Sequence, residues 1–173
     1  ERVFTKADYY ATIFEPIKQV IKKYDTNNIL DHHFLNSRGA IARFDRNAIE
    51  IRLVDIQECP KADIAICALI IEVLKLLVNE DTTSLKKQKK WLKQDLYSIF
   101  NAVIKDGEVY NILNLDYLEL FGIKQVTNVK NVWHHLYMLV KENITKDHQK
   151  ALEIIFNHGT LSTRIVKALN QDV

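Results

Sequence analysis

The sequence predicts an α+β fold that is mostly α-helical and contains one small antiparallel β-hairpin. Three observations predict it. Apolar residues recur at helical spacing along most of the chain, one short stretch around Asp45 alternates at period two, and only four glycines and two prolines occur among 173 residues. A chain of this length fits one domain with a sizeable core, so we expect a single domain covering 1–173.

The composition restricts the class of protein. Hydrophobic residues make up 47% of the chain and charged residues 27%, which excludes a disordered chain, a collagen and a disulfide scaffold. Cys59 and Cys67 stand in apolar surroundings and at no zinc or redox spacing, so they predict reduced, non-catalytic thiols, with a single disulfide left open.

The most apolar run, Ile64–Ile71, is too short to span a bilayer, and no signal peptide precedes the first periodic segment. We therefore expect a cytoplasmic protein that does not bind membranes.

Two helical segments are expected before the hairpin. The first covers 5–24, because Thr5 and Asp8 stand at capping-box spacing ahead of a helically periodic stretch. Pro16 should kink this helix or divide it, since proline lacks the N–H that a helix interior needs. A second, short helix should end near Asn36.

Helices account for the rest of the chain. Pro60 stands like a first-turn proline at the start of an apolar helix over 60–78, which we expect to be the central core helix. The remaining expected elements are helices over 85–107, 128–143, 146–159 and 161–170, with a short irregular or helical piece over 114–123.

A β-hairpin is predicted over about 39–56, where two alternating stretches flank Arg46-Asn47. A two-residue loop at that pair places Arg43 directly opposite Glu50 and Arg46 on the apolar side. The alternation then separates the side chains almost completely by face. The charged face carries Arg43, Asp45, Glu50 and Arg52, and the apolar face carries Ala40, Ala42, Phe44, Ile49, Ile51 and Leu53.

The charged face of the hairpin has two interpretations. It could be a solvent-exposed ladder of ion pairs, each worth about 0.2–1 kcal/mol. It could equally be one wall of a site, where a carboxylate takes a hard cation and guanidinium groups take carboxylate or phosphate. The pattern leaves both open. A lone hairpin is marginal in water, so this one should lie on the helices, pair with another chain or belong to a larger sheet.

The order of residues adds a resemblance. The run "NSRGAIARFDRNAIEIRLVDIQECPKADIAI", beginning at Asn36, resembles the C-terminal part of the bacterial and plant-type glutamate–cysteine ligase family, which are ATP-dependent carboxylate–amine ligases of the glutamine synthetase-like superfamily. The ending "IIFNHGTLSTRIVKAL" is similar to the close of those enzymes. The resemblance is strong over about Asn36–Leu77, weaker near the C-terminus and faint elsewhere.

The resemblance implies the C-terminal part of a glutamine synthetase-like catalytic fold and a role in glutathione biosynthesis. The implied substrates are ATP with Mg²⁺, glutamate, and an amine such as cysteine. Transferred residue by residue, Glu50 becomes a metal ligand, and Arg52 becomes a catalytic residue that binds the carboxylate of the substrate glutamate. Arg43 becomes a catalytic residue that contacts phosphate or the acyl phosphate. Arg38 and Arg46 become secondary candidates for contact with the nucleotide phosphates.

The family pattern is incomplete in this chain. The family's enzymes are about twice as long, and their first half carries a glutamate-rich strand with the remaining metal ligands. The 37 residues before Arg38 contain no such strand and read as helices. We therefore expect the C-terminal portion of a longer ligase, inactive without its N-terminal part as partner. Homo-oligomerisation is left open.

Other motifs predict ordinary structure. His32-His33 and His134-His135 are adjacent pairs, whose members should point about 100° apart on a helix, so no zinc site is expected. The lysines of 86–93 predict a solvated helix start rather than a nucleic-acid or membrane contact. The net charge of +2 likewise gives no indication of nucleic acid. The alternative to a ligase is a non-enzymatic helical interaction module with a solvated charged hairpin.

Overall fold

The computed structural model describes residues 1–170 and divides into two compact units, Glu1–Asp55 and Ile56–Val173. Each unit is described by itself. The first contains short helices and the hairpin, and the second is a helical unit with its own apolar core. The mostly helical α+β class is therefore confirmed, whereas the expectation of one domain stays a prediction. Within residues 1–170, no helix combines the length and apolarity that crossing a membrane requires.

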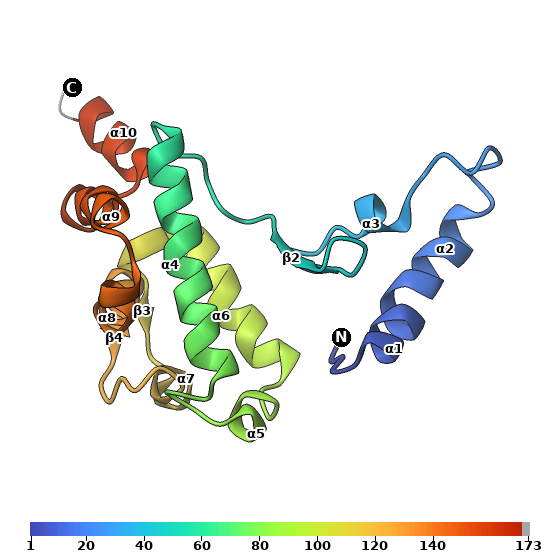
Figure 1. Ribbon diagram of the computed structural model, residues 1–173, viewed down its shortest axis with the longest axis horizontal. Helices are drawn as coiled ribbons and strands as arrows, with labels where there is room; N and C mark the ends of the chain where they lie inside the picture. The colour runs from blue at the N-terminus through green and yellow to red at the C-terminus, as the bar shows by residue number, and fades with distance from the viewer. Residues whose placement is uncertain (171–173) are drawn as a thin grey trace. The chain divides into compact units, whose positions relative to one another are not determined.

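The first unit begins with three consecutive helical segments, α1 (Lys6–Tyr9), the π-helical turn η1 (Tyr10–Phe14) and α2 (Glu15–Ile21). Thr5 caps α1, with its Oγ1 accepting a hydrogen bond from the Asp8 N–H at 3.1 Å. Pro16 lies in the first turn of α2, and the π-helical turn immediately precedes it. The proline therefore follows an irregular π-helical turn, but it does not divide the helix, because Figure 1 shows the three pieces as one continuous helical rod.

The hairpin pairs β1 (Ala40–Arg43) with β2 (Ala48–Ile51) in antiparallel register. The predicted two-residue loop is wrong, because Arg43 pairs with Ala48, and Ile41 pairs with Glu50. The loop has four residues, closed by a 3.0 Å hydrogen bond from the Arg46 N–H to the Arg43 carbonyl. A two-residue type I′ loop needs two residues with positive φ, whereas this loop needs only Asn47, at φ 49°. The register shift is two residues, so each residue of the two strands keeps its predicted face.

The charged face of the hairpin is the more buried of the two, although Asp45 on it is exposed and Glu50 and Arg52 are half-buried. Ile41 and Arg43 are only 2% and 4% exposed, whereas Ile49 on the apolar face is 62% exposed. Phe44, in the loop, also packs on the helices of this unit, because its ring lies 5.4 Å from that of Tyr9, 5.7 Å from that of Tyr10 and 6.4 Å from that of Phe14. The hairpin therefore lies on the helices of its own unit, the first of the three arrangements expected.

Between α2 and the hairpin lies α3 (His32–Leu35), a single turn capped by Asp31. The Asp31 Oδ1 accepts a 2.7 Å hydrogen bond from the His33 N–H. The chain then passes through Asn36, which is fully buried. Its side-chain amide donates to the Tyr9 hydroxyl at 3.0 Å, and that hydroxyl also accepts from the Ala42 N–H at 3.2 Å. These bonds connect α1, α3 and β1.

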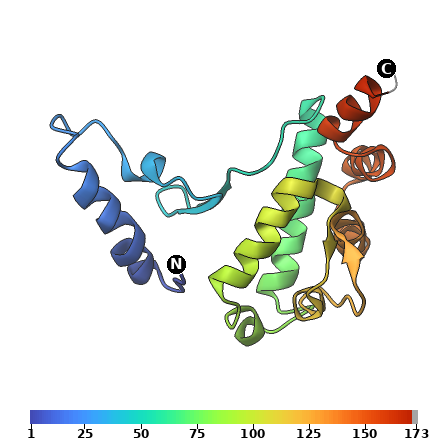
Figure 2. The same ribbon diagram turned by 180° about the vertical axis from the view of Figure 1, so that it is seen from behind.

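The second unit is built on α4 (Pro60–Val78), which packs against α8 (Val129–Val140) and α9 (Lys146–His158) (Figures 1 and 2). The predicted core helix over 60–78 is confirmed in bounds and in burial. The other elements are α5 (Leu85–Gln88), α6 (Lys93–Asp106), η2 (Gly107–Val109), β3 (Asn111–Ile112), α7 (Leu115–Glu119), β4 (Thr127–Asn128), η3 (Lys141–Asn143) and α10 (Leu161–Leu169).

Two features of the second unit differ from the prediction. The helix expected over 85–107 is broken into α5 and α6, because Leu92 takes an extended conformation at φ −85° and ψ 148°. A second small antiparallel pair joins β3 to β4, with Ile112 opposite Thr127. Two-residue strands leave too short a run of alternation to be recognised in a sequence.

Candidate functional site

Arg43 is the centre of a cluster of charged side chains on the more buried face of the hairpin. Its Nε and Nη2 donate to the two carboxylate oxygens of Asp45 at 3.0 and 2.8 Å, and its Nη1 donates to the Glu50 Oε2 at 2.8 Å. The side chain of Arg43 is only 5% exposed. A two-pronged contact of this kind fixes the guanidinium plane as well as its position.

Arg52 completes the cluster on the other side of Glu50. Its Nε donates to the Glu50 Oε1 at 2.6 Å, so each oxygen of this carboxylate faces a different guanidinium group. The remaining nitrogens of Arg52 donate to main-chain carbonyls near α3, with Nη1 bonded to Asn36 and Nη2 to His33 at 3.3 Å. The side chain of Arg52 is 26% exposed, so solvent reaches it directly.

Hydrogen bonds within the cluster favour the charged forms of Asp45, Glu50 and Arg43. The hydrogen bonds from Arg43 lower the pKa of Asp45 from 3.8 to about 2. The hydrogen bonds from Arg52, and then from Arg43, lower the pKa of Glu50. Those from Asp45 and Glu50 raise the pKa of Arg43 further. The four charges cancel, so an incoming anion must compete with Asp45 or Glu50 for a guanidinium group.

Mg²⁺ does not fit the cluster in the arrangement observed. Magnesium sites use one or two carboxylates together with water and substrate phosphates. Both oxygens of Glu50 and both of Asp45 already accept hydrogen bonds from guanidinium groups, which repel a cation. The prediction that Glu50 is a metal ligand therefore stays a prediction, and it requires Arg43 or Arg52 to leave the carboxylate.

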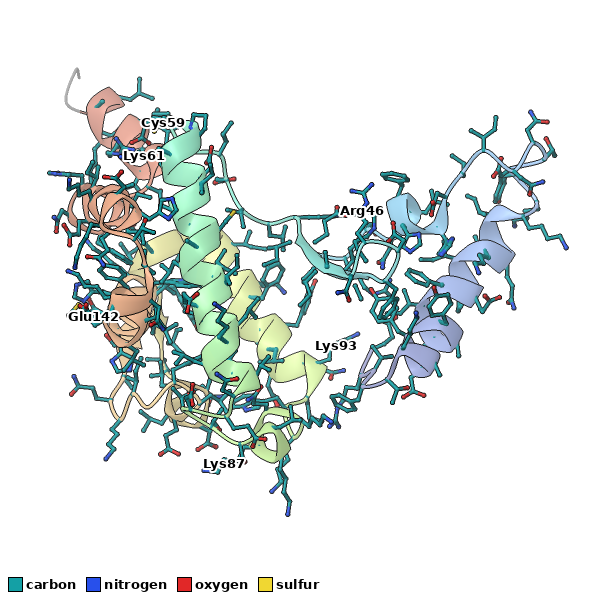
Figure 3. All side chains as sticks on the ribbon, viewed as in Figure 1. Arg46, Cys59, Lys61, Lys87, Lys93 and Glu142 are labelled. Atoms are coloured by element: carbon teal, nitrogen blue, oxygen red, sulfur yellow. The ribbon has the colours of Figure 1, made fainter. Side chains whose placement is uncertain are left out.

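The secondary candidates Arg38 and Arg46 lie at the edge of the cluster. Arg46 (Figure 3) is in the loop, and its side chain is 63% exposed. Its Nε lies 3.6 Å from the Asp45 Oδ2, so its expected place on the apolar side is wrong. Arg38 forms an ion pair with Glu1 at 2.8 Å and donates to the Asn36 Oδ1 at 3.0 Å. Asn36 thus contacts Arg38 through its side chain and Arg52 through its carbonyl.

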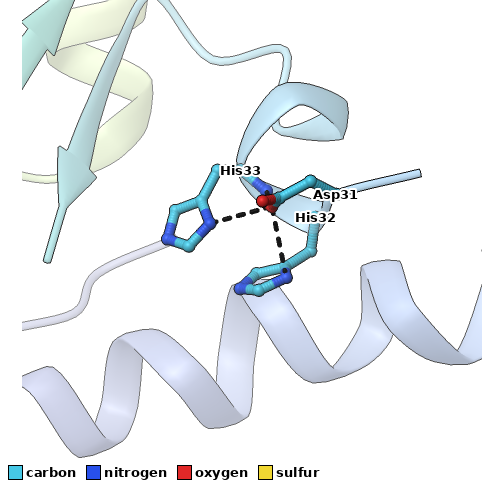
Figure 4. A group of neighbouring side chains, drawn as sticks. All are labelled: Asp31, His32 and His33. Carbon is cyan, nitrogen blue, oxygen red and sulfur yellow. Dashed lines mark hydrogen bonds and ion pairs between the residues drawn. The ribbon is translucent and has the colours of Figure 1, made fainter. Parts of the chain in front are cut away.

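Sequence reasoning missed a second group beside the cluster, formed by Asp31, His32 and His33 (Figure 4). One oxygen or nitrogen from each of these three side chains lies within 4.8 Å of the others. The two imidazole rings lie 4.2 Å apart between centroids, so the expected divergence of about 100° did not prevent them from meeting. The sequence feature that indicates this group is an N-cap aspartate directly before two histidines.

The basic segment 86–93 contributes to an open pocket in the second unit. Lys87, Lys90 and Trp91 line it together with the acidic residues Asp95, Asp116 and Glu119. Mixed charge of this kind differs from the continuous basic surface of a nucleic-acid site. The two cysteines are free and exposed, so the disulfide that the sequence left open is not formed.

Comparison with known proteins gives one partial match. The chain is 42% identical over 52 residues to an uncharacterized protein of Archaeoglobus fulgidus. The matched segment is 30% of this chain but only 14% of the archaeal protein, so the similarity concerns a small part of that protein. No protein-family model matches the chain. No solved structure matches it either.

Proposed function

We propose that the chain is the C-terminal part of an ATP-dependent carboxylate–amine ligase, a glutamate–cysteine ligase of the glutamine synthetase-like superfamily that acts in the cytoplasm. One observation carries the proposal. Glu50 lies between the guanidinium groups of Arg43 and Arg52, within the segment whose residue order resembles this family. The proposal treats the chain as an incomplete catalytic unit that needs the N-terminal part of the enzyme.

The reaction requires groups that hold negative charge. An oxygen of the glutamate γ-carboxylate attacks the γ-phosphorus of ATP, ADP leaves, and an acyl phosphate forms. The amine nitrogen then attacks the acyl carbon, phosphate leaves, and the nitrogen loses a proton. Mg²⁺ accompanies ATP in this chemistry and neutralises phosphate charge. Preorganised guanidinium donors stabilise the charge that develops on carboxylate and phosphoryl oxygens.

Each arginine of the cluster has a separate role in the proposal. Arg52 binds the carboxylate of glutamate, because it is the partly exposed member and can exchange Glu50 for a substrate carboxylate. Arg43 contacts the phosphoryl group, while Asp45 fixes its orientation through two hydrogen bonds. Arg38 and Arg46 stand at the edge, where they contact the nucleotide phosphates.

The alternative function is that of a helical interaction module. The exposed apolar side chains of the hairpin favour it, since Ile49 is 62% and Leu53 56% exposed. Its second premise, a solvated charged face, does not hold for Arg43, whose side chain is 5% exposed. A module would bind a partner through the apolar face and would release no phosphate from ATP.

The test of the ligase proposal is phosphate release from ATP by the complete gene product. The assay contains glutamate and one amine at a time, with cysteine first and other amino acids after it. The proposal expects phosphate release that needs both glutamate and an amine, with formation of the γ-glutamyl amide in equal amount. ATP hydrolysis without amide, or no hydrolysis with any amine, would favour the interaction module.

A further inference from the structure

Asp31, His32 and His33 place three metal-ligating side chains around one point on the surface of the first unit. The Asp31 Oδ1 lies 2.9 Å from the Nδ1 of His33 and 3.5 Å from the Nδ1 of His32, as the dashed lines in Figure 4 show. Ligands bound to one zinc ion at about 2.0–2.2 Å in tetrahedral geometry are separated by about 3.4 Å. The distance from the Asp31 Oδ1 to the His32 Nδ1 already has this value. The distance from the Asp31 Oδ1 to the His33 Nδ1 must increase by about half an ångström.

Packing holds both imidazole rings in place. The ring of Phe14, a residue that is fully buried, lies 4.5 Å from that of His32 and 4.9 Å from that of His33, edge to face in both cases. The side chain of His33 is 10% exposed and that of His32 is 22% exposed. The two rings are therefore fixed before any ion binds, which lowers the entropic cost of binding.

The outer nitrogens of the two rings are the places where a supporting hydrogen bond to a metal-bound histidine would form. The Nε2 atoms of His32 and His33 are buried and have no hydrogen-bond partner within the described part of the chain. The Asp45 Oδ1 lies 3.5 Å from the His33 Nε2, beyond a hydrogen bond but in position to receive one. A histidine that binds metal through Nδ1 carries its proton on Nε2, and a carboxylate commonly accepts it. Asp45 occupies that place.

The charges around the three side chains permit a cation. The nearby cationic side chains Lys18, Arg43 and Arg52 are each paired with a carboxylate, Lys18 with Glu15 at 3.0 Å, Arg43 with Asp45 at 2.8 Å and Arg52 with Glu50 at 2.6 Å.

We propose that Asp31, His32 and His33 bind one divalent transition-metal ion, Zn²⁺, and that Asp45 positions His33 by accepting its Nε2 proton. Two imidazoles and a carboxylate are a ligand set that zinc uses in three-ligand sites, where a fourth position stays open to water or substrate. Asp31 has 48% of its side chain exposed, so the open position faces solvent. The site is separate from the predicted Glu50 ligand, and it does not depend on the ligase proposal.

The test measures binding of Zn²⁺ alone to the intact chain by isothermal titration calorimetry. The expected result is one ion per chain with a dissociation constant of about 1 μM or tighter at pH 7.5. His32→Asn, His33→Asn and Asp31→Asn should each weaken binding by about tenfold or more, and Asp45→Asn by about tenfold. Asparagine at position 31 still caps α3 while it removes the negative charge of Asp31. His134→Asn, at an exposed histidine of the other adjacent pair, should leave binding unchanged.

A measurement on the unaltered chain covers the case in which a variant fails to fold. The chain has six histidines, and one equivalent of Zn²⁺ should shift the imidazole NMR signals of His32 and His33 but not those of the other four. Binding that is equally strong in all variants would overturn the proposal. Zinc-induced shifts at the other histidines alone, or no saturable binding, would overturn it as well.

Discussion

Arg43 and Glu50 form a 2.8 Å ion pair across the hairpin although they are not directly opposite each other in the ladder. Glu50 is paired with Ile41, and Arg43 with Ala48, so the two charged side chains meet on the diagonal of the same face. Long side chains bridge such diagonal positions readily. This contact joins the pair Arg43–Asp45, at the end of β1, to the pair Glu50–Arg52, at the end of β2.

Replacing Arg43 should release the carboxyl group of Asp45. In Arg43→Met, the pKa of Asp45 should rise from about 2 toward 3.8, because the hydrogen bonds from this guanidinium are the largest cause of its low value. Arg43→Lys should give an intermediate value, since an ammonium cannot donate two parallel hydrogen bonds to one carboxylate. NMR titration of the aspartate carboxyl carbons measures the change, and Arg46→Lys is the control. A pKa that stays near 2 in Arg43→Met would contradict the assignment.

The stability of the first unit should fall in acid because of Asp45. Its folded-state pKa of about 2 lies below the ordinary 3.8, so the stabilisation is fully present above pH 3.8 and is lost as the pH falls toward 2. Glu50 also stabilises the unit less as the pH falls, since its folded-state pKa is lowered as well. Amide hydrogen exchange of the hairpin, followed from pH 5 to pH 2, measures the loss.

The matched variants for this pH dependence are Asp45→Asn and Asp106→Asn. The first should flatten the loss of protection between about pH 4 and pH 2, because an amide does not titrate there. The second removes an exposed aspartate of the other unit and should leave the hairpin unchanged. Identical pH profiles for the wild type and Asp45→Asn would show that the ion pair does not stabilise the hairpin.

The hairpin loop should be sensitive to the residue at position 47. Asn47 has φ 49°, a left-handed conformation that asparagine tolerates and β-branched residues avoid. Asn47→Val should cost about 1–2 kcal/mol in the free energy of unfolding, whereas Asn47→Gly should be neutral or slightly stabilising. Ala48→Val adds the same side chain one residue later, in the strand, and should cost less. Urea denaturation that shows equal losses for both valine variants would argue against the loop conformation.

The positions of the main elements could be predicted from the sequence. The apolar run after Pro60 gives a helix that ends at Val78, and the alternation around Asp45 gives the hairpin and its separation into two faces. Periodicity shows which residues share a face, but not which face packs on the protein. Arg52 donates hydrogen bonds to the main-chain carbonyls of His33 and Asn36. These carbonyls belong to another segment of the chain, so only the tertiary structure reveals the contacts.

Patterns of neighbouring residues do not predict the hairpin register or the direction of a side chain where a single turn or rotamer decides it. The register depends on whether the loop has two or four residues, and Arg46-Asn47 is compatible with both. Adjacent positions on a regular helix point about 100° apart, so the sequence predicts that the rings of His32 and His33 diverge. In α3, one turn long, both rings instead turn toward Phe14 and toward Asp31. Packing against an aromatic ring 18 residues away in the sequence is not visible to a local pattern.

The most direct test of the ligase proposal compares turnover of the complete gene product with that of Glu50→Gln and Arg52→Lys. Both variants keep the size of the side chain, and Glu142→Gln, at an exposed glutamate of the second unit (Figure 3), is the matched control. The proposal predicts glutamate- and amine-dependent phosphate release that falls by about 100-fold or more in both variants and is unchanged in the control. Turnover within about twofold of the wild type in both variants would contradict it and leave the cluster with a structural role only.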